Sequence, residues 1–284
     1  MKSILRKIAA AELSDQPFRH LYIADLLDPE DFQAVVRSPL VAVEPCESDA
    51  ELCDRLAQLG WQIKIHPGCS DNLEEYLRWH GGSSTSVRNQ DTCEGFGVAF
   101  RLQRFPEGRL REIAEFFGSD VFLSALAQKF CLDYSTLSKE FGLHKYLDGY
   151  EISPHPDWRR KALTMMLNVN PSPISEQLDF HTHYLSLKPH WRFIQELWAT
   201  RPEIDRCWVP WDWCDTVYRQ TANNSLVAFA PGHDTFHAVR ARYDHLATQR
   251  TQFYANLNVK LLQPEPRMPS WRDFLPRQVE PQVV

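Results

Sequence analysis

The chain has 284 residues, a net charge of −6 at pH 7, 43% hydrophobic residues and 24% charged residues. This balance is typical of a folded globular protein and excludes a mostly disordered or collagen-like chain. The negative net charge, the lack of a basic run and the lack of an apolar stretch of roughly 20 residues argue against nucleic acid or a membrane as a partner.

The N-terminal segment and the cysteines indicate a cytoplasmic protein. Residues 1–16 contain basic side chains but no long apolar core, so we interpret them as a short helix and not as a signal peptide. The seven cysteines form no CxxC pair and no zinc-ribbon spacing, which indicates free thiols in a reducing compartment.

The first 142 residues predict a mixture of strands and helices. Asp28, followed by Pro29 and two acids, has the pattern of a helix N-terminus. Gly60 and Ser119 have the residue types of a helix C-cap and a helix N-cap. The predicted strands are 18–23, 61–65 and 96–105, the predicted helices after the one at Asp28 are 49–60, 70–80, 109–117, 120–131 and 134–141, and the predicted loops are 81–88 and 106–108.

After Gly142 the pattern changes to short strand-like runs separated by turns, with one predicted helix at 189–199. Evenly spaced strands after a helical first half predict an antiparallel sandwich or barrel with helices packed on one face. The proline-rich tail from Gln263 predicts an irregular wrap. The strand-like runs are 143–153, 161–169, 177–187, 206–218, 224–230, 235–241 and 250–260.

Two of these runs, 162–170 and 250–260, alternate between apolar and polar residues, which places the two kinds on opposite faces of a strand. The polar faces fit a barrel interior that holds a polar ligand, and a solvent-facing side is the alternative. The polar residues are Thr164, Asn168 and Asn170 in the first run and Arg250, Gln252, Tyr254, Asn256 and Asn258 in the second.

The strongest chemical signal is the pair His155-x-Asp157 at the end of a predicted strand. Because positions i and i+2 of a strand point the same way, the imidazole and the carboxylate can bind one metal ion. His237 supplies a second imidazole much later in the chain. Two histidines and one carboxylate leave three adjacent positions open on iron.

The order of the surrounding motifs makes this pair more specific. Y-x-x-G at 146–149 precedes H-x-D at 155–157, and L-T-M-M-L-N-V-N-P at 163–171 follows it. N-S-L-V-A-F at 224–229 and H-A-V at 237–239 complete the order. This succession resembles the Fe(II)/2-oxoglutarate-dependent oxygenases, especially their prolyl-hydroxylase-like branch.

The resemblance covers about residues 143–260, with a weaker match at 18–36. It implies a mainly β fold with α, in which a double-stranded β-helix, or jelly roll, is flanked by N-terminal helices. We expect a single oxygenase domain over 1–284, with a supporting part at 1–142, the jelly-roll core at 143–262 and an irregular tail at 263–284.

The resemblance also implies Fe(II), 2-oxoglutarate and O2 as cofactors and cosubstrates. The Fe(II) ligands would be His155, Asp157 and His237. A halogenating relative has Gly or Ala in place of the carboxylate. The presence of Asp157 therefore favours hydroxylation, or desaturation, of an unactivated C–H bond, with succinate and CO2 as coproducts.

In this family a basic residue after the distal histidine holds the far carboxylate of 2-oxoglutarate. Arg240, Arg242 and Arg250 compete for this role. We favour Arg250, because it lies on the polar face of its strand and a guanidinium grips a carboxylate with two parallel hydrogen bonds. Further candidate cosubstrate donors are Thr164, Asn168 and Tyr146.

Two further groups of residues each leave three explanations open. His181 and His183 point the same way on a predicted strand and would contact substrate, bind a second metal ion or only line the barrel. The tryptophan-rich segment 189–213, which includes Trp211 and Trp213, would stack on substrate, close the barrel mouth or pack as an apolar plug.

The substrate is expected to be a small polar metabolite, amino-acid-like or sugar-like. Residues 243–246 and 250–257 show a faint resemblance to carrier-independent amino-acid halogenases and hydroxylases. A zinc or manganese hydrolase or isomerase on the same scaffold and a non-catalytic binding module are the alternatives. The identity of the substrate and the oligomeric state stay open.

Overall fold

The computed structural model describes residues 1–65, 69–70, 72–82 and 97–260. Its helices are α1 (Lys2–Ala10), α2 (Pro29–Val36), α3 (Asp49–Gln58), α4 (Leu73–His80), α5 (Arg109–Phe117), α6 (Asp120–Lys129) and α7 (Phe193–Thr200). Its strands are β1 (Leu13–Ser14), β2 (His20–Ile23), β3 (Gln62–Ile63), β4 (Ala99–Leu102), β5 (Leu137–Tyr146), β6 (Glu151–His155), β7 (Lys161–Asn168), β8 (Thr182–Leu187), β9 (Cys214–Arg219), β10 (Leu226–Phe229), β11 (His237–Arg240) and β12 (Arg250–Val259).

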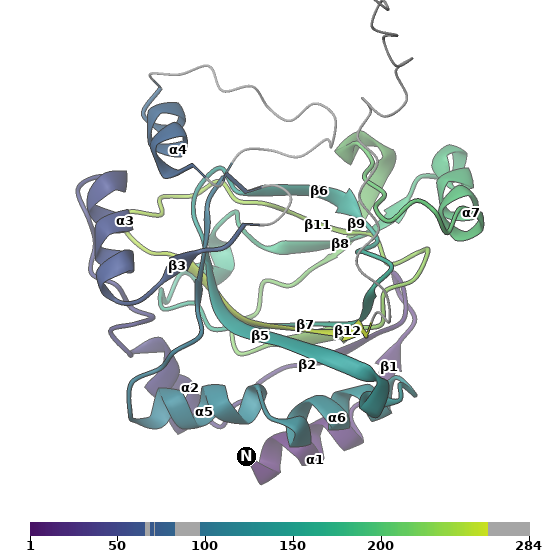
Figure 1. The fold of residues 1–284 in the computed structure, drawn as a ribbon, viewed down its shortest axis with the longest axis horizontal. Coiled ribbons are helices and arrows are strands. Elements are labelled where there is room, and N and C mark those ends of the chain that lie inside the picture. The colour runs from purple at the N-terminus through teal and green to yellow at the C-terminus, as the bar shows by residue number, and fades with distance from the viewer. Residues whose placement is uncertain (66–68, 71, 83–96, 261–284) are drawn as a thin grey trace, which may run out of the picture.

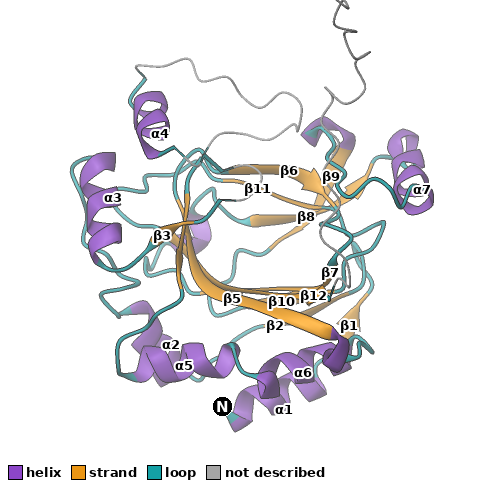
Figure 2. Ribbon diagram, viewed as in Figure 1, coloured by secondary structure: helices purple, strands orange, loops and turns teal. Residues whose placement is uncertain are grey.

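The strands form two antiparallel sheets that face each other (Figure 1). The large sheet has eight strands in the order β1-β2-β10-β7-β12-β5-β4-β3, and the small sheet has four in the order β6-β11-β8-β9. Helices α1, α2, α5 and α6 cover the outer side of the large sheet, while α3 and α4 lie beside the end that carries β3 (Figure 2).

The main hydrophobic core lies between the large sheet and its helices. Leu163 and Leu167 of β7 and Phe253 and Leu257 of β12 are fully buried there beside apolar side chains of the helices. Burying one such side chain contributes about 1.5–3 kcal/mol. The alternation predicted for these two strands is confirmed, except that Val259 at the end of β12 is 47% exposed.

The register of β12 fixes which side chains face the small sheet. Its full length pairs with β5, from Arg250 opposite Tyr146 to Val259 opposite Leu137. On its other edge it pairs with β7, where Asn256 lies opposite Thr164. Because strand side chains alternate, residues paired across neighbouring strands point to the same face.

Several predicted local features are confirmed. Ser119 accepts a hydrogen bond from the backbone N–H of Phe122 as the N-cap of α6. Gly60 follows α3 with a φ of 87°, a value that glycine adopts without strain. Asp28 precedes α2 but its side chain accepts no capping bond, and its carboxylate instead accepts a hydrogen bond from the Ser3 hydroxyl at 3.1 Å.

Two predictions for the chain around β5 are wrong. The helix expected at 134–141 is a single turn at 134–136, after which β5 begins. Pairing with β12 along all of β5 outweighs the local helical pattern. The single strand expected at 143–153 is divided into β5 and β6 by a turn in which Gly149 has a φ of 79°.

Some predictions concern residues outside the described ranges. These are most of the loop expected at 81–88, the first residue of the strand expected at 96–105, and the tail expected at 263–284. Among the described residues, no helix is long and apolar enough to cross a membrane.

Gly97 provides a test of how tightly the segment before β4 packs against the turn that begins at Gly149. A Cβ at this position would lie 2.3 Å from the Tyr150 Cα. Backbone atoms cannot move aside cheaply, so Gly97→Ala is expected to lower the free energy of unfolding by about 1–3 kcal/mol. Urea denaturation followed by circular dichroism measures this loss.

Gly232→Ala is the matched control, because the nearest atom to its Cβ is a side-chain oxygen of Asp234 at 3.3 Å. We expect a change below about 0.5 kcal/mol for this variant. Equal stability of both variants and the wild type would contradict the close backbone approach at Gly97.

Candidate metal centre

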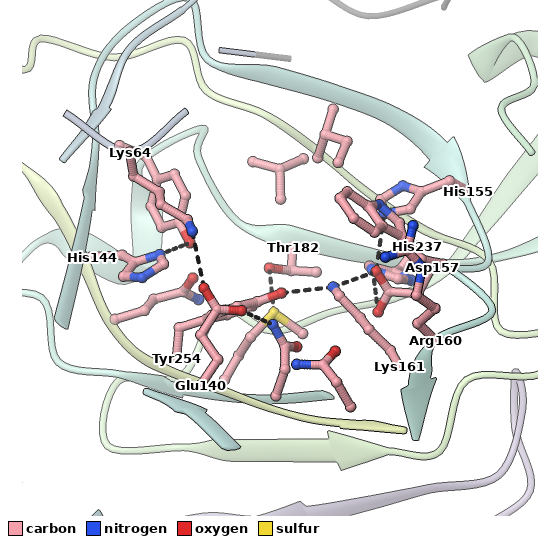
Figure 3. A pocket seen from close by; sticks show the side chains of 18 of the residues that line it. Lys64, Glu140, His144, His155, Asp157, Arg160, Lys161, Thr182, His237 and Tyr254 are labelled. Atoms are coloured by element: carbon pink, nitrogen blue, oxygen red, sulfur yellow. Dashed lines mark hydrogen bonds and ion pairs between the residues drawn. The ribbon is translucent and has the colours of Figure 1, made fainter. Parts of the chain in front are cut away.

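A cavity of about 950 Å³ lies between the two sheets (Figure 3). Alternate residues of β5 and β12 form much of its wall, because the opposite faces of these strands are held in the core. From β5 these are Ser138, Glu140, His144 and Tyr146, and from β12 they are Arg250, Gln252, Tyr254, Asn256 and Asn258.

One end of the cavity brings together the predicted triad of His155, Asp157 and His237 (Figure 3). His155 ends β6, His237 begins β11, and the two residues are paired directly across these strands. The Nε2 atom of His155 lies 3.5 Å from one oxygen of Asp157, and that of His237 lies 3.8 Å from the other. All three side chains are buried. A group of this composition can hold one metal ion.

The backbone orients both imidazoles. The Nδ1 atoms of His155 and His237 lie 2.8 and 2.9 Å from the carbonyl oxygens of Ser153 and Thr235. A carbonyl accepts only, so each Nδ1 carries a proton, and each Nε2 faces Asp157. Burial lowers the pKa of His237 to about 3, which keeps this ring in the neutral form that binds metals.

Asp157 is held by two donors from β7. The Lys161 ammonium lies 2.6 Å from one carboxylate oxygen, and the Thr164 hydroxyl donates to the other at 2.6 Å. Burial alone would raise the pKa of Asp157, but the positive charge of Lys161 keeps it well below its usual range. The residue has a φ of 73°. It therefore carries a fixed negative charge on an uncommon backbone conformation.

Arg250 brings a buried cation into the same cavity. Its Nη2 donates to the Thr182 hydroxyl at 2.9 Å, and its guanidinium lies 4.6 Å from the centre of the Tyr146 ring. Among the described residues, its buried Nη1 has no hydrogen-bond partner and no carboxylate pairs with it. Burial lowers the pKa of this side chain. An uncompensated buried charge is costly, so this position favours an anionic ligand.

The two competing arginines lie elsewhere. Arg240 donates to Glu151 at 2.8 Å and lies over the Trp211 ring, outside the cavity lining. Arg242 is exposed. Of the three candidates, Arg250 alone lines the cavity within the described part of the chain.

The predicted cosubstrate donors are placed differently from one another. Tyr146 lines the cavity, whereas Thr164 and Asn168 lie behind its lining. The amide of Asn168 donates to the carbonyls of Gln220 and Ala222, and its oxygen accepts from Gln252. These bonds occupy the amide of Asn168 and leave Tyr146 as the candidate that faces the cavity.

The structure places the predicted substrate contacts outside the described cavity lining. His183 bonds Thr216 at 3.0 Å, and Trp211 packs edge-on against its ring. Trp213 stacks on Trp191 at 3.7 Å. Thr182, the first residue of β8, lines the cavity, so strand alternation turns His183 away from it, and His181 before the strand is not part of the described lining either. This placement favours the packing explanation for the tryptophan-rich segment.

Sequence reasoning missed several charged residues of the cavity. Lys64 and Arg101 both pair with Glu140, at 3.0 and 2.8 Å. Burial opposes ionisation of Glu140, but hydrogen bonds from Lys64 and Asn256 lower its pKa to about 2. The alternation of polar residues along β5 could have indicated this wall of the cavity. It was not recognised because a helix was predicted at 134–141.

Comparison of the sequence with protein-family profiles and with curated proteins found no match. A solved prolyl-4-hydroxylase from Pseudomonas putida is similar with a TM-score of 0.45 and 12% identity, covering 90% of this chain and 97% of that one. A prolyl hydroxylase from Trichoplax adhaerens, solved with a hypoxia inducible factor oxygen degradation domain peptide fragment, is similar with a TM-score of 0.41 and 11% identity. The match covers 91% of this chain and 88% of that one.

An oxidoreductase of the 2OG-Fe(II) oxygenase family from Burkholderia pseudomallei gives a TM-score of 0.31 and 10% identity, covering 76% of this chain and 92% of that one. The chain resembles the Fe(II)/2-oxoglutarate-dependent oxygenases. Because these TM-scores are below 0.5, we base the functional proposal on the geometry of the site.

Removing one imidazole tests the metal centre directly. His155→Ala is expected to bind one equivalent of Fe(II) less than the wild type, because the two remaining ligands hold the ion much more weakly. Anaerobic titration followed by measurement of bound iron gives the stoichiometry. His190→Ala, which removes an exposed histidine, is the control. Unchanged iron in His155→Ala would show that the triad is not the metal site.

Proposed function

We propose that the chain is a single-domain Fe(II)/2-oxoglutarate-dependent dioxygenase, with a double-stranded β-helix core, that hydroxylates an unactivated C–H bond of a small polar metabolite. One observation carries this proposal. A buried two-histidine, one-carboxylate group and a buried guanidinium without a carboxylate partner among the described residues line the same cavity.

The residues present fit a metal ion of this kind. His155, Asp157 and His237 would hold Fe(II) through two Nε2 atoms and one carboxylate oxygen, and the backbone already fixes the required tautomers. Lys161 and Thr164 orient the carboxylate, as outer hydrogen-bond partners do for metal ligands. Bound Fe(II) would supply the activation of O2, coupled to oxidation of 2-oxoglutarate to succinate and CO2.

Arg250 would bind the far carboxylate of 2-oxoglutarate. The free Nη1 and the Nη2 that already contacts Thr182 present a planar pair of donors, which matches a carboxylate. Tyr146 lies against this guanidinium and fixes its position. A dicarboxylate bound between the metal and Arg250 would compensate this buried cation, which pairs with no carboxylate among the described residues.

The remainder of the cavity suits a polar substrate. Tyr254, Asn256 and Glu140 present hydroxyl, amide and carboxylate groups on one wall. Trp158 and Arg206 also line the cavity, and the Arg206 guanidinium lies 3.6 Å from the centre of the Trp158 ring. This mixture of donors, acceptors and ring surface supports an amino-acid-like or sugar-like metabolite.

A metal-dependent hydrolase or isomerase and a non-catalytic binding module are less consistent with the site. A hydrolase that acts through a metal-bound water does not need a buried guanidinium beside the metal. A binding module does not need three buried metal ligands with fixed tautomers. The hydrolase would retain metal but bind no 2-oxoglutarate.

The direct test of the proposed function is an anaerobic titration of the protein with Fe(II) and 2-oxoglutarate. We expect a metal-to-ligand charge-transfer band that saturates with 2-oxoglutarate. A screen of polar metabolites for succinate release in air then identifies the substrate. No such band at saturating iron would reject the oxygenase assignment.

Arg250→Ala tests the cosubstrate anchor. Truncating one partner of a buried charge pair costs about 2–5 kcal/mol in binding, and each 1.4 kcal/mol is about tenfold. The apparent KM for 2-oxoglutarate should therefore rise roughly 30-fold or more. Iron content should stay normal, because no metal ligand is changed.

Arg250→Lys should restore only part of the affinity, since an ammonium cannot make the paired contact. Arg240→Ala and Arg242→Ala are the matched controls, because both arginines lie outside the described cavity lining. If either control shows the large change in KM while Arg250→Ala behaves as wild type, the anchor is misassigned.

A further inference from the structure

A second group of metal-binding side chains lies outside the cavity lining. Asp49 is the first residue of α3 and His80 is the last residue of α4. His245 lies in the segment between β11 and β12, and Asp148 lies in the turn between β5 and β6. Four segments that are far apart in the sequence therefore meet at one point.

Asp49 is the centre of this group. One of its oxygens lies 2.7 Å from Nδ1 of His80, and the other lies 2.6 Å from Nε2 of His245. The two imidazole rings meet edge to face with their centres 4.8 Å apart. The ligand atoms of Asp49, His80 and His245 all lie within 4.8 Å of one another.

Asp148 holds the far side of His80. Its carboxylate lies 3.0 Å from Nε2 of His80, and it also accepts a hydrogen bond from the backbone N–H of Tyr243 at 2.9 Å. A histidine that binds a metal through one nitrogen almost always donates the other N–H to such a carboxylate. The pair therefore has the arrangement of a metal ligand and its outer support.

We propose that Asp49, His80 and His245 bind a second divalent metal ion, Zn2+. Imidazole nitrogens and a carboxylate oxygen are suitable zinc ligands, and a water molecule would complete a tetrahedron. Ligands about 2.0–2.2 Å from the metal lie roughly 3.3 Å apart, so the present spacing needs only small shifts. Zn2+ would neutralise the two carboxylates of Asp49 and Asp148.

The site would connect the helices to the segment that leads into the cavity. His245 is buried at 1% exposure, five residues before Arg250. The same segment bonds the chain before α3, where the backbone N–H of Cys46 donates to the carbonyl of Leu246 at 3.1 Å. A metal ion bound at Asp49 would hold α3 and α4 against this segment and so stabilise the start of β12.

The test uses the full chain stripped of metal, titrated with ZnCl2 and analysed for bound zinc after gel filtration. The variant His155→Ala/His237→Ala removes the site of the cavity. We expect about two zinc equivalents in the wild type, about one in this double variant and none after adding His80→Ala. His190→Ala, added to the same background, is the control and should retain the remaining zinc.

Asp148→Asn in the double-variant background is the conservative test. The amide still accepts from Tyr243 but no longer provides a carboxylate to His80, so zinc affinity should fall by about 10–100-fold. Zinc binding should also raise the melting temperature of the double variant, since the ion binds only the folded state. Circular dichroism of each metal-free variant verifies that it is folded.

Failure of the double variant to bind zinc overturns the proposal and leaves the four residues as a hydrogen-bonded charge network. Retention of zinc after loss of His80 overturns it as well. These outcomes do not depend on oxygenase activity, because the double variant lacks the site of the cavity. The titration with 2-oxoglutarate can therefore fail or succeed independently.

Discussion

The pairing of β12 between β5 and β7 is the constraint on which the rest of the molecule depends. The apolar residues of these strands are fixed in the core against the helices. Strand alternation then turns the opposite faces of β5 and β12 toward the cavity, and a register slip of one residue would exchange the two faces of a strand. Burial in the core therefore positions Arg250, Tyr146 and Tyr254, although none of them is in the main core cluster.

The charged residues in and beside the cavity fall into two kinds. Asp157 with Lys161, and Glu140 with Lys64 and Arg101, are balanced within the protein at distances of 2.6–3.0 Å. Arg250 donates to the Thr182 hydroxyl and lies over the Tyr146 ring, and no carboxylate pairs with it among the described residues. In a low-dielectric interior, charges that are paired within the protein can organise the site, whereas an unpaired cation favours an anionic ligand.

Much of this arrangement was readable in the sequence, because short-range patterns carry it. The H-x-D pair, the alternation in 250–260 and the glycine after α3 each depend on a few neighbouring residues. The extent of β5 and the orientation of His181 and His183 could not be read from the sequence, because pairing between distant strands decides both. Lys161 was missed because no local pattern indicates that it folds back onto Asp157, and the group around Asp49 joins residues almost 200 positions apart.

The backbone of Asp157 has a consequence for how this site can change. A φ of 73° is uncommon for an aspartate but unstrained for glycine. A single replacement by glycine would remove a proposed metal ligand and at the same time relax the chain, whereas alanine would keep the strain of about 1–2 kcal/mol. In evolutionary terms, the substitution that replaces the carboxylate by an open coordination position would also lower the backbone strain at residue 157. The same replacement would leave the Lys161 ammonium without its carboxylate partner, and this unpaired cation would attract a halide.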